Sequence, residues 1–470
     1  MDARSITVRG LRRRDLLQYS VISAGAIGLA ACGTVTTAPA SAPEQEAEAE
    51  ESAKAEEAPK EAEPVTIQYY TALNDRQQEL YPTMVVDEFQ AAFPGIQVET
   101  VLREGPFYDK LHALVAAGEP PDTSWFSYPE AYLRGVFTHV TDYVKRDNYD
   151  ISVFPAGAMK TLAMWQGDVL GLPNQSGGSW PVMPYNKEIL ASEGISDPPL
   201  TWTDDSWNAE AWLEALQKVA KWEGDNPTRF GINGIGAGVM VYWGPMWAGS
   251  WVSEDLKSVT CDSEEMIAGI QYITDLVARY RVMDKPGQLN EVFGTGNARD
   301  LFFDGKLAFF RTSGGQTFAV AEAVKDGKPY GFAPIPKFGI VGSGQAVDPN
   351  GIINGAKHPD EGWEFIKWQA DTPNWAITRG NAPSRQDHFD AWGEAVYGGF
   401  AAEARVEVYR ESLAHAVTID PVFSLPNWRI PIWRDMVGPA MTKLYNGEGD
   451  VKETLEQLKV QIEGEMPEVE

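Results

Sequence analysis

Cysteine and positive charge are both scarce in this sequence. The 470 residues include 2 Cys, which excludes a scaffold held by several disulfides and a zinc site made of cysteines. Lys and Arg total 39 against 67 Asp and Glu, so the formal net charge is −28. A surface of that sign repels the phosphates of a nucleic acid, and we therefore exclude a nucleic-acid partner.

Motifs for catalysis and for metal binding are also missing. The 5 His form no His-Glu-x-x-His run, and no Gly-x-Ser-x-Gly element occurs. The glycine-rich stretch 231–238 lacks the Gly-Lys-Ser/Thr that a phosphate-binding loop requires. No motif therefore indicates catalysis, and we expect no resident metal or cofactor. A surface glycan-degrading enzyme stays an alternative, because the two facing carboxylates that it needs follow no motif.

The N-terminus is typical of an export signal. Three arginines at 12–14 precede an apolar stretch at 19–31, which is too short to span a bilayer as a mature helix. The basic run resembles a twin-arginine signal, although Gln18 stands where that pattern ends in Lys, so Sec export stays open. After residue 32 no apolar run is long enough to cross a membrane.

The apolar stretch ends in a sequence that resembles a bacterial lipobox, Leu29-Ala30-Ala31-Cys32. Residues 1–32 then form a signal peptide, and acyl chains on Cys32 anchor the protein to the cell membrane, which is the only membrane attachment that we predict. Residues 33–64 contain nine Glu, two Lys and almost no apolar side chains. Such a segment cannot bury enough surface to fold, so we expect a disordered acidic tether.

From residue 65 onward, strand-like and helix-like segments alternate. Residues rich in β-branched and aromatic side chains predict strands at 65–70, 96–102 and 123–126. Apolar residues four apart predict a helix before Pro94, and a second helix begins near Pro106. This alternation predicts an α/β fold with a mostly parallel sheet.

Polar residues in front of helical patterns predict helix caps rather than catalytic groups. We expect Thr203 or Asp204 to cap a helix at 207–222, and Asp262 to cap a helix at 262–280. Tryptophans inside helical patterns are expected to pack in the core, whereas the excess of Trp, 16 in all, leaves others free to contact a ligand.

Short phrases of the body occur in an order that is specific as a set. In sequence they are Phe93-Pro94-Gly95-Ile96, Phe107-Tyr108-Asp109-Lys110-Leu111, Ala116-Ala117-Gly118-Glu119-Pro120-Pro121-Asp122, Gly171-Leu172-Pro173, Tyr185-Asn186-Lys187, Pro198-Pro199 with Thr201-Trp202, Phe303-Asp304-Gly305-Lys306, and the helix from His358 to Phe365. Together, over about residues 65–465, they resemble the extracellular solute-binding proteins of carbohydrate ABC importers, the group that contains maltose-binding protein.

The resemblance implies an α/β periplasmic-binding-protein fold with two lobes, several crossovers and a ligand cleft between the lobes. Lobe 1 is assigned to 65–176 and 350–400, and lobe 2 to 177–349 and 401–470. The implied function is the capture of a mono- or oligosaccharide by interlobe closure and its delivery to ABC permease subunits. The protein is then an extracytoplasmic, lipid-anchored monomer. The same scaffold holding a polyamine, a peptide or a metal ion is the alternative.

Ligand contacts are expected just after strands, because ligands of open α/β sheets lie beyond the carboxyl ends of the strands. The indole face of a Trp matches the C–H face of a pyranose, and the sugar hydroxyls need polar partners. The resemblance favours Trp433 in the C-terminal segment, with Trp428 as its alternative. The predicted ligand-binding residues are Tyr70, Thr71, Asn74, Trp125, Ser127, Asn174, Gln175, Trp180, Trp243, Trp247, Ser313, Gly314, Asn350 and Trp433.

Overall fold

The computed structural model describes residues 63–105, 107–425 and 427–466. The predicted signal peptide, Cys32 and nearly all of the predicted acidic tether lie outside these residues. Within the described ranges, no helix combines the length and the apolar character needed to cross a membrane. Nor do these residues bring three His, Cys, Asp or Glu side chains together in a group that could hold a metal ion.

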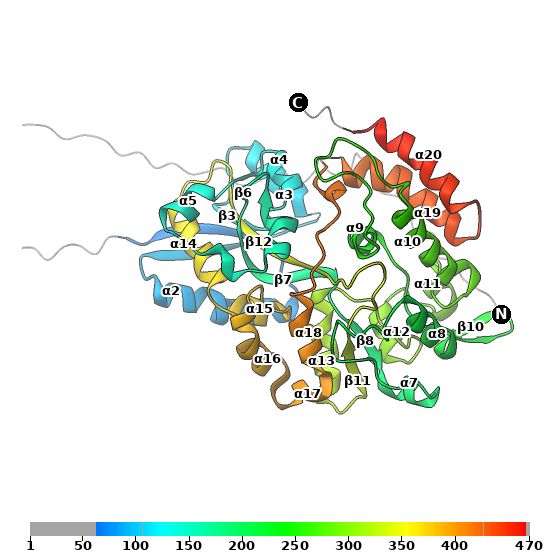
Figure 1. The fold of residues 1–470 in the computed structure, drawn as a ribbon. Coiled ribbons are helices and arrows are strands. Elements are labelled where there is room, and N and C mark those ends of the chain that lie inside the picture. The colour runs from blue at the N-terminus through cyan, green and yellow to red at the C-terminus, as the bar shows by residue number, and fades with distance from the viewer. Residues whose placement is uncertain (1–62, 106, 426, 467–470) are drawn as a thin grey trace, which may run out of the picture. The chain divides into compact units, whose positions relative to one another are not determined.

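The first part of the body is a mixed, six-stranded sheet (Figure 1). Its strands run in the order β2 (Ile96–Leu102), β1 (Val65–Thr71), β3 (Thr123–Trp125), β12 (Gly344–Ile353) and β4 (Phe137–Thr138), with β7 (Leu172–Trp180) also paired to β12. β1 is parallel to β2 and β3, which confirms the three strands expected there. β12 is antiparallel to β3, β4 and β7, which the sequence did not predict.

Helices pack on this sheet and bury two apolar clusters. α14 (Pro359–Ala370) lies against β1, β3, β7 and β12. The helix predicted before Pro94 is three consecutive pieces: α1 (Asp75–Tyr81), a π-helical stretch (Pro82–Asp87) and α2 (Glu88–Ala92). The other helices of this part are α3 (Phe107–Ala116), α4 (Pro129–Leu133), α5 (Thr141–Arg146), α6 (Ala156–Ala158) and α15 (Asn374–Arg379). A short hairpin joins β5 (Met164–Trp165) to β6 (Asp168–Val169).

The second part surrounds a small sheet in which β8 (Met183–Asn186) pairs antiparallel with β11 (Tyr330–Ala333). Single bridges join Tyr185 to Phe309 and Phe230 to Leu307, so irregular extended segments widen the sheet. The helices of this part are α7 (Lys187–Ser192), α8 (Ala209–Val219), α9 (Ala237–Met246), α10 (Glu264–Thr274), α11 (Gln288–Phe293), α12 (Ala298–Phe303), α13 (Thr317–Lys325), α16 (Phe389–Tyr397), α17 (Ala401–Ala404), α18 (Val406–Ser412), α19 (Gly438–Tyr445) and α20 (Val451–Glu463).

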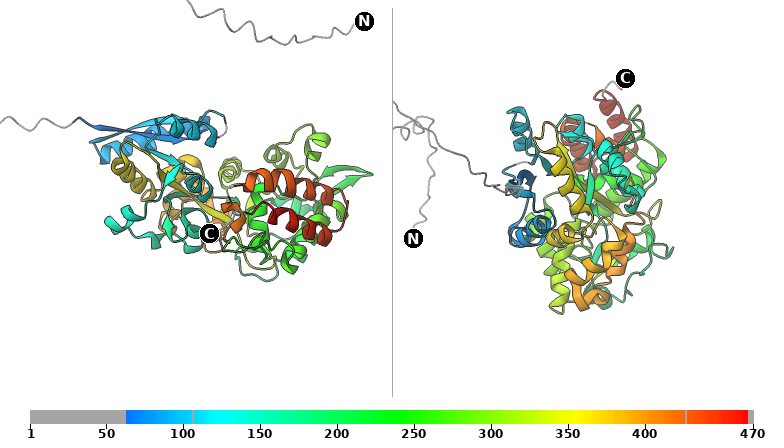
Figure 2. Two further views of the ribbon diagram at one scale, coloured as in Figure 1. Left: turned by 90° about the horizontal axis from the view of Figure 1, so that it is seen from above. Right: turned by 90° about the vertical axis from the view of Figure 1, so that its left-hand side faces the viewer.

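The C-terminal helices close the second part of the body. α20 packs against α10 and α19, and α19 also contacts the turn that follows α10 (Figure 2). Lys459 of α20 donates to both carboxylate oxygens of Asp262, at 3.0 and 2.9 Å. The largest buried cluster of the chain forms here, with Trp180, Trp212 and Trp243 in its core.

Three segments connect the two parts. β7 and β12 pair along their length, and each begins in one buried cluster and ends in another: Leu172 lies in the first part and Trp180 in the second. The third segment follows α15, where Ser176 N donates to Ala382 O at 2.8 Å. Trp392 of α16 packs in the cluster of the second part, whereas the sequence analysis assigned 350–400 to lobe 1. The assigned lobe boundaries stay a prediction.

Two of the predicted helix caps are wrong. Asn208 caps α8, accepting hydrogen bonds from the backbone N–H groups of Glu210 and Ala211, because Asp204 is used in a turn with Ser206. α8 also ends earlier than expected, since the chain turns into β9 (Lys221–Glu223), which pairs with β10 (Asn226–Arg229).

The cap of α10 is one residue further on than predicted. Ser263 accepts from the backbone N–H of Met266, at 3.3 Å. The carboxylate of Asp262 is held instead by Lys459. A neighbouring tertiary charge has therefore taken the side chain that the local pattern assigned to the helix.

Candidate ligand-binding site

A cavity of about 330 Å³ lies where the two parts of the body meet, which is within the range of small-molecule sites. The first part contributes Gln77, Trp125, Phe126, Tyr128 and Arg379 to its wall. The second part contributes Tyr242, Phe423 and the loop Ser313–Gly315. The connecting strands supply Gly177, Gly178 and Asp348, so side chains far apart in sequence converge on one space.

A second, larger cavity of about 710 Å³ differs in character. Its wall is mainly apolar and includes Val153, Phe154, Met159 and Met164. The smaller cavity instead combines aromatic rings with several polar groups, which is the pattern of a specific binding site. We therefore take the smaller cavity as the candidate site.

Trp125 is covered on both faces of its indole. The Phe126 ring lies 3.5 Å from the Trp125 ring between centroids, at an angle of 25°. The Arg379 Cζ atom lies 3.8 Å from the centroid of the same ring. Two groups this close cannot share one face, so they sandwich the indole, which is 6% exposed. The partly exposed aromatic rings of the cavity wall are those of Phe126, Tyr128 and Phe423.

The backbone of Phe126 is in the left-handed region, with φ of 66°. This conformation costs roughly 1–2 kcal/mol for a residue with a side chain. The strain directs the Phe126 ring onto Trp125, and the Tyr128 ring then meets Phe126 edge-on at 4.8 Å. Strained non-glycine residues of this kind are concentrated at functional sites.

Asp348 is the buried acid of the cavity wall. Its Oδ1 accepts a hydrogen bond from the Tyr128 hydroxyl at 2.8 Å, and its Oδ2 accepts one from the Gln175 amide at 2.6 Å. Burial raises the pKa of Asp348, and these two donors act against that rise. A Cβ on Gly177 would lie 2.6 and 2.7 Å from the two carboxylate oxygens, so a side chain there would displace the carboxylate from its two donors.

Arg379 ends α15 and points its guanidinium into the same wall. Its Nη1 donates to the carbonyl oxygen of Ala72 and, at 3.4 Å, to Oε1 of Gln77. Desolvation lowers the pKa of Arg379 to about 10, which leaves the group charged at neutral pH. Asn381, two residues on, has a buried Oδ1 with no partner among the described residues.

Asp420 supports the wall from behind. Its Oδ2 accepts from the backbone N–H of Trp251 at 2.7 Å, and its Oδ1 accepts from Val422 N at 3.1 Å. The neighbours Ile419 and Phe423 line the cavity. Burial raises the pKa of Asp420 to about 7.

Raising the pH from 5 to 8 is expected to lower the free energy of unfolding by roughly 2 kcal/mol through Asp420. This carboxyl titrates near 4 in the unfolded chain, so the folded state binds more protons between about pH 4 and 7. Stability present below pH 4 is therefore lost as the pH rises through the folded pKa. Urea unfolding at each pH measures the slope, and Asp420→Asn reduces it. An unchanged slope in that variant contradicts the assignment.

The sequence of the chain also matches a described family. The profile of the bacterial extracellular solute-binding proteins matches residues 74–374, which is more than half of the chain. The chain belongs to this family. Members of this family are binding proteins, and the cavity of this solute-binding protein is the candidate place for a solute.

Solved structures share the two-lobed fold of this solute-binding protein. An ABC substrate-binding protein of Listeria monocytogenes, solved with cycloalternan, is 19% identical, with a TM-score of 0.68 over 86% of this chain and 99% of that one. The GacH receptor of Streptomyces glaucescens, solved free and with acarbose, is 17% identical, with a TM-score of 0.64 over 87% and 100%. Maltose-bound MalE3 of T. maritima is 18% identical, with a TM-score of 0.62 over 85% and 99%.

Of the residues predicted to bind ligand, Trp125, Ser313 and Gly314 line the cavity of this solute-binding protein. Gln175 lies behind the wall and holds Asp348. Asn74 lies nearby but caps α1, accepting from Gln77 N at 2.9 Å. Trp125 ends β3, as the rule for strand ends expects, whereas Ser313 and Gly314 follow a segment that forms only the single bridges of Leu307 and Phe309.

Other predicted residues are used for internal packing. Asn350 accepts from the Tyr69 hydroxyl at 3.1 Å, and Asn174 donates to Gln369 at 2.9 Å. The Ser127 hydroxyl donates to Leu170 O at 2.8 Å. Tyr70 and Thr71 are fully buried. None of these residues lines the cavity among the described residues, and a ligand contact by any of them stays a prediction.

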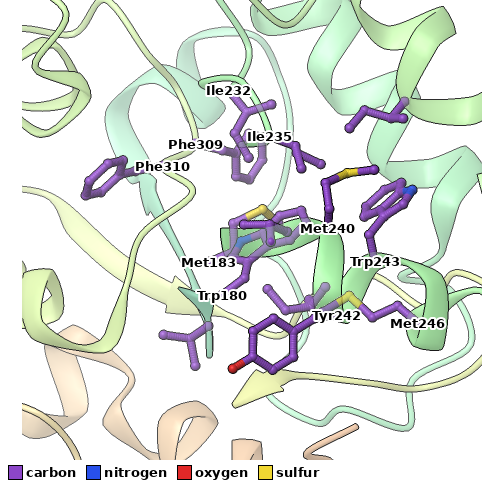
Figure 3. Packing of buried hydrophobic residues seen from close by; sticks show 14 of the residues in the cluster. Trp180, Met183, Ile232, Ile235, Met240, Tyr242, Trp243, Met246, Phe309 and Phe310 are labelled. Atoms are coloured by element: carbon purple, nitrogen blue, oxygen red, sulfur yellow. The ribbon is translucent and has the colours of Figure 1, made fainter. Parts of the chain in front are cut away.

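The predicted tryptophans other than Trp125 lie in the large cluster of the second part. Trp180 and Trp243 are fully buried and stack at 6.3 Å between ring centroids (Figure 3). Trp247 stacks on Phe338 at 5.4 Å. Trp433 packs against Trp428 at 5.5 Å. Each of these rings contacts at least one other aromatic ring, and contact with a ligand stays a prediction for them as well.

Several residues that line the cavity were not predicted from the sequence, for reasons that the structure shows. Tyr242 is adjacent to Trp243 on α9, but one residue turns the side chain by about 100° on a helix, and Tyr242 faces the cavity. Figure 3 shows Tyr242 at the edge of the cluster, with its hydroxyl directed away from Trp243. Arg379 is the last residue of α15, and Asn381 comes two residues later. The expectation that ligand contacts follow strands therefore does not include them.

Proposed function

We propose that this solute-binding protein is the substrate-binding component of an ABC importer and captures a mono- or oligosaccharide. The observation that carries the proposal is one cavity that combines the strained, partly exposed ring of Phe126 with converging polar side chains. The C–H face of a pyranose matches the negative face of an aromatic ring. The hydroxyls find a donor in Arg379 and an acceptor in Asn381. Ligands named for the similar solved structures, cycloalternan, acarbose and maltose, support a saccharide.

Binding is favoured over glycan cleavage by the acids of the wall. Among the described residues that line the cavity, Asp348 is the single carboxylate. Glycoside hydrolysis by the usual route needs two, on either side of the bond. Both oxygens of Asp348 already accept hydrogen bonds from Tyr128 and Gln175, which suits a structural role.

Capture is proposed to proceed by closure of the two lobes about the three connecting segments. A solute that contacts both walls of the cavity stabilises the closed form and shifts the population toward it. The closed monomer then presents its solute to permease subunits in the membrane. Hydrolysis of ATP takes place on a separate protein of the importer.

The sugar proposal is tested by the thermal midpoint of the full chain against panels of saccharides, polyamines, peptides and metal ions. A ligand present at about 100 times its dissociation constant adds roughly 2.7 kcal/mol to the stability, which moves the midpoint visibly. We expect a shift with one saccharide series. A shift with polyamines, peptides or metal ions alone contradicts the sugar and keeps the scaffold, and reducing ends released from a polysaccharide contradict a pure binding role.

We also propose that the protein is exported and held outside the cytoplasm by lipid on Cys32. In a bacterial host, Cys32→Ser is expected to abolish labelling by a radioactive fatty acid and to move the protein out of the membrane fraction. Cys261→Ser is the matched control, because Cys261 is fully buried within the second part of the body. Retained labelling of Cys32→Ser contradicts the anchor.

A further inference from the structure

Within the described residues, the Nε–Nη2 edge of the Arg379 guanidinium makes no hydrogen bond to the protein. The hydrogen bonds of the side chain, to Ala72 O and to Gln77 Oε1, both come from Nη1. Its Nε is buried and has no hydrogen-bond partner among the described residues. The edge formed by Nε and Nη2 carries two parallel N–H groups, the arrangement that binds both oxygens of a carboxylate.

Burial lowers the pKa of Arg379, and the charge of Asp348 opposes this effect without direct contact. No ion pair of the described residues includes Arg379 at 4.0 Å or less, although the chain has 67 acids. Asp348 is the acid of the same cavity, and its oxygens are taken by Tyr128 and Gln175. The exposed Arg103, on the loop after β2, adds to the positive potential, since it lowers the pKa of Arg379 further.

A guanidinium that has lost water and gained no anion is unfavourable, because the desolvation of an ion is repaid only by a close and well-oriented counter-charge. The π-face of Trp125 lies against the guanidinium and offsets part of this desolvation cost. Neutral hydroxyls can occupy the free edge, but hydrogen bonds between two charged groups are roughly twice as strong as neutral ones. The net charge of −28 is no obstacle, because salt screens exposed charges beyond about 10 Å.

We infer that the saccharide carries a carboxylate, as uronic acids do, and that this carboxylate binds the Nε–Nη2 edge of Arg379. The inference rests on the proposed function and names the chemical class of its solute. The sugar ring lies against Phe126, and the contact between the carboxylate of the sugar and Arg379 sets the specificity. Arg379 thus distinguishes acidic saccharides from their neutral counterparts.

The test compares matched pairs of saccharides by calorimetry on the full chain. Each pair differs in one group, as glucuronate differs from glucose and galacturonate from galactose, and their short oligomers extend the series. We expect one uronate series to bind at least tenfold more tightly than its neutral counterpart. Arg379→Gln removes this preference, and Arg379→Lys, which keeps the charge without the fork, restores part of it. Arg299→Gln, on the surface of α12, leaves it unchanged.

The wild-type comparison decides the inference even if an Arg379 variant does not fold. Neutral saccharides binding as tightly as the matched uronates overturn the inference and leave the proposed function standing. Binding of acetate or lactate as tight as that of a uronate overturns the saccharide part. A panel in which neither acidic nor neutral saccharides bind counts against the proposed function itself.

Discussion

Replacing Gly178 by alanine is expected to destabilise the protein by about 4 kcal/mol or more, enough to prevent folding of a marginally stable chain. Gly178 has φ of +115°, a conformation that residues with a side chain rarely adopt. A Cβ there would lie 2.2 Å from the Gly344 carbonyl oxygen and 2.9 Å from Gln345 Cα. Both are backbone atoms of β12, so neither can turn aside as a side chain would.

The lost stability is that of the connection between the two lobes, because Gly178 lies within it. Gly178 pairs with Gln345 in the β7–β12 ladder that joins the two parts of the body, and it also lines the cavity. Urea unfolding of purified variants measures the change, read from the midpoint at constant slope. A variant that folds is expected to bind solute weakly as well, since β7 and β12 carry Gly177 and Asp348.

Gly118→Ala is the matched control. Gly118 also has positive φ, +75°, but a Cβ there meets nothing within 4 Å. Gly118→Ala is expected to lower the free energy of unfolding only by the cost of the left-handed backbone, roughly 1–2 kcal/mol. If Gly178→Ala loses no more than Gly118→Ala, then β7 and β12 do not approach each other as closely as described.

Phe126→Ala is expected to weaken the binding of the solute by roughly tenfold to a hundredfold, the size of effect typical of an aromatic anchor at a binding site. The Phe126 ring is one of the partly exposed aromatic surfaces of the cavity wall, and it stacks beside Trp125, which Arg379 covers on its other face. Its removal deletes the stacking contact with the sugar ring. Calorimetric titration with the solute found in the thermal screen measures the loss.

A second variant at this position separates affinity from strain. Phe126→Gly removes the ring but tolerates φ of 66°, so we expect it to be more stable than Phe126→Ala by about 1 kcal/mol while binding as weakly. Phe400→Ala is the control, because that ring is 41% exposed and lies outside the cavity wall. Full affinity in Phe126→Ala contradicts the stacking role.

Much of the fold could be predicted because its signals are local or are held in an ordered set of phrases. The segments 65–70 and 96–102 are rich in the β-branched and aromatic side chains typical of strands, and the structure pairs them in parallel. The order of the phrases indicated the family, and the match over 74–374 confirms it. Predicted strand ends indicated Trp125 and the loop at Ser313, because the carboxyl ends of strands are where such folds place ligands.

The direction of individual side chains was decided only in the folded protein. The register of β12 against β7 shifts between Asp348 and Pro349, which breaks the alternation of faces along the strand. Asp348 lines the cavity, whereas the predicted Asn350 turns into the core and bonds to Tyr69 and Gln369. No local sequence pattern predicts this shift in register, because it depends on how two strands far apart in sequence pair.

The sequence by itself determined what kind of protein this is: its α/β segments, its family and two of the loops at its cavity. Only the tertiary structure decided which groups meet in that cavity. Arg379 contacts Trp125 from a helix that lies about 250 positions further along the chain. It covers a face of the indole that was predicted from the sequence to contact a sugar. The physical reason is that a contact between distant segments depends on packing and register, which no stretch of residues encodes alone.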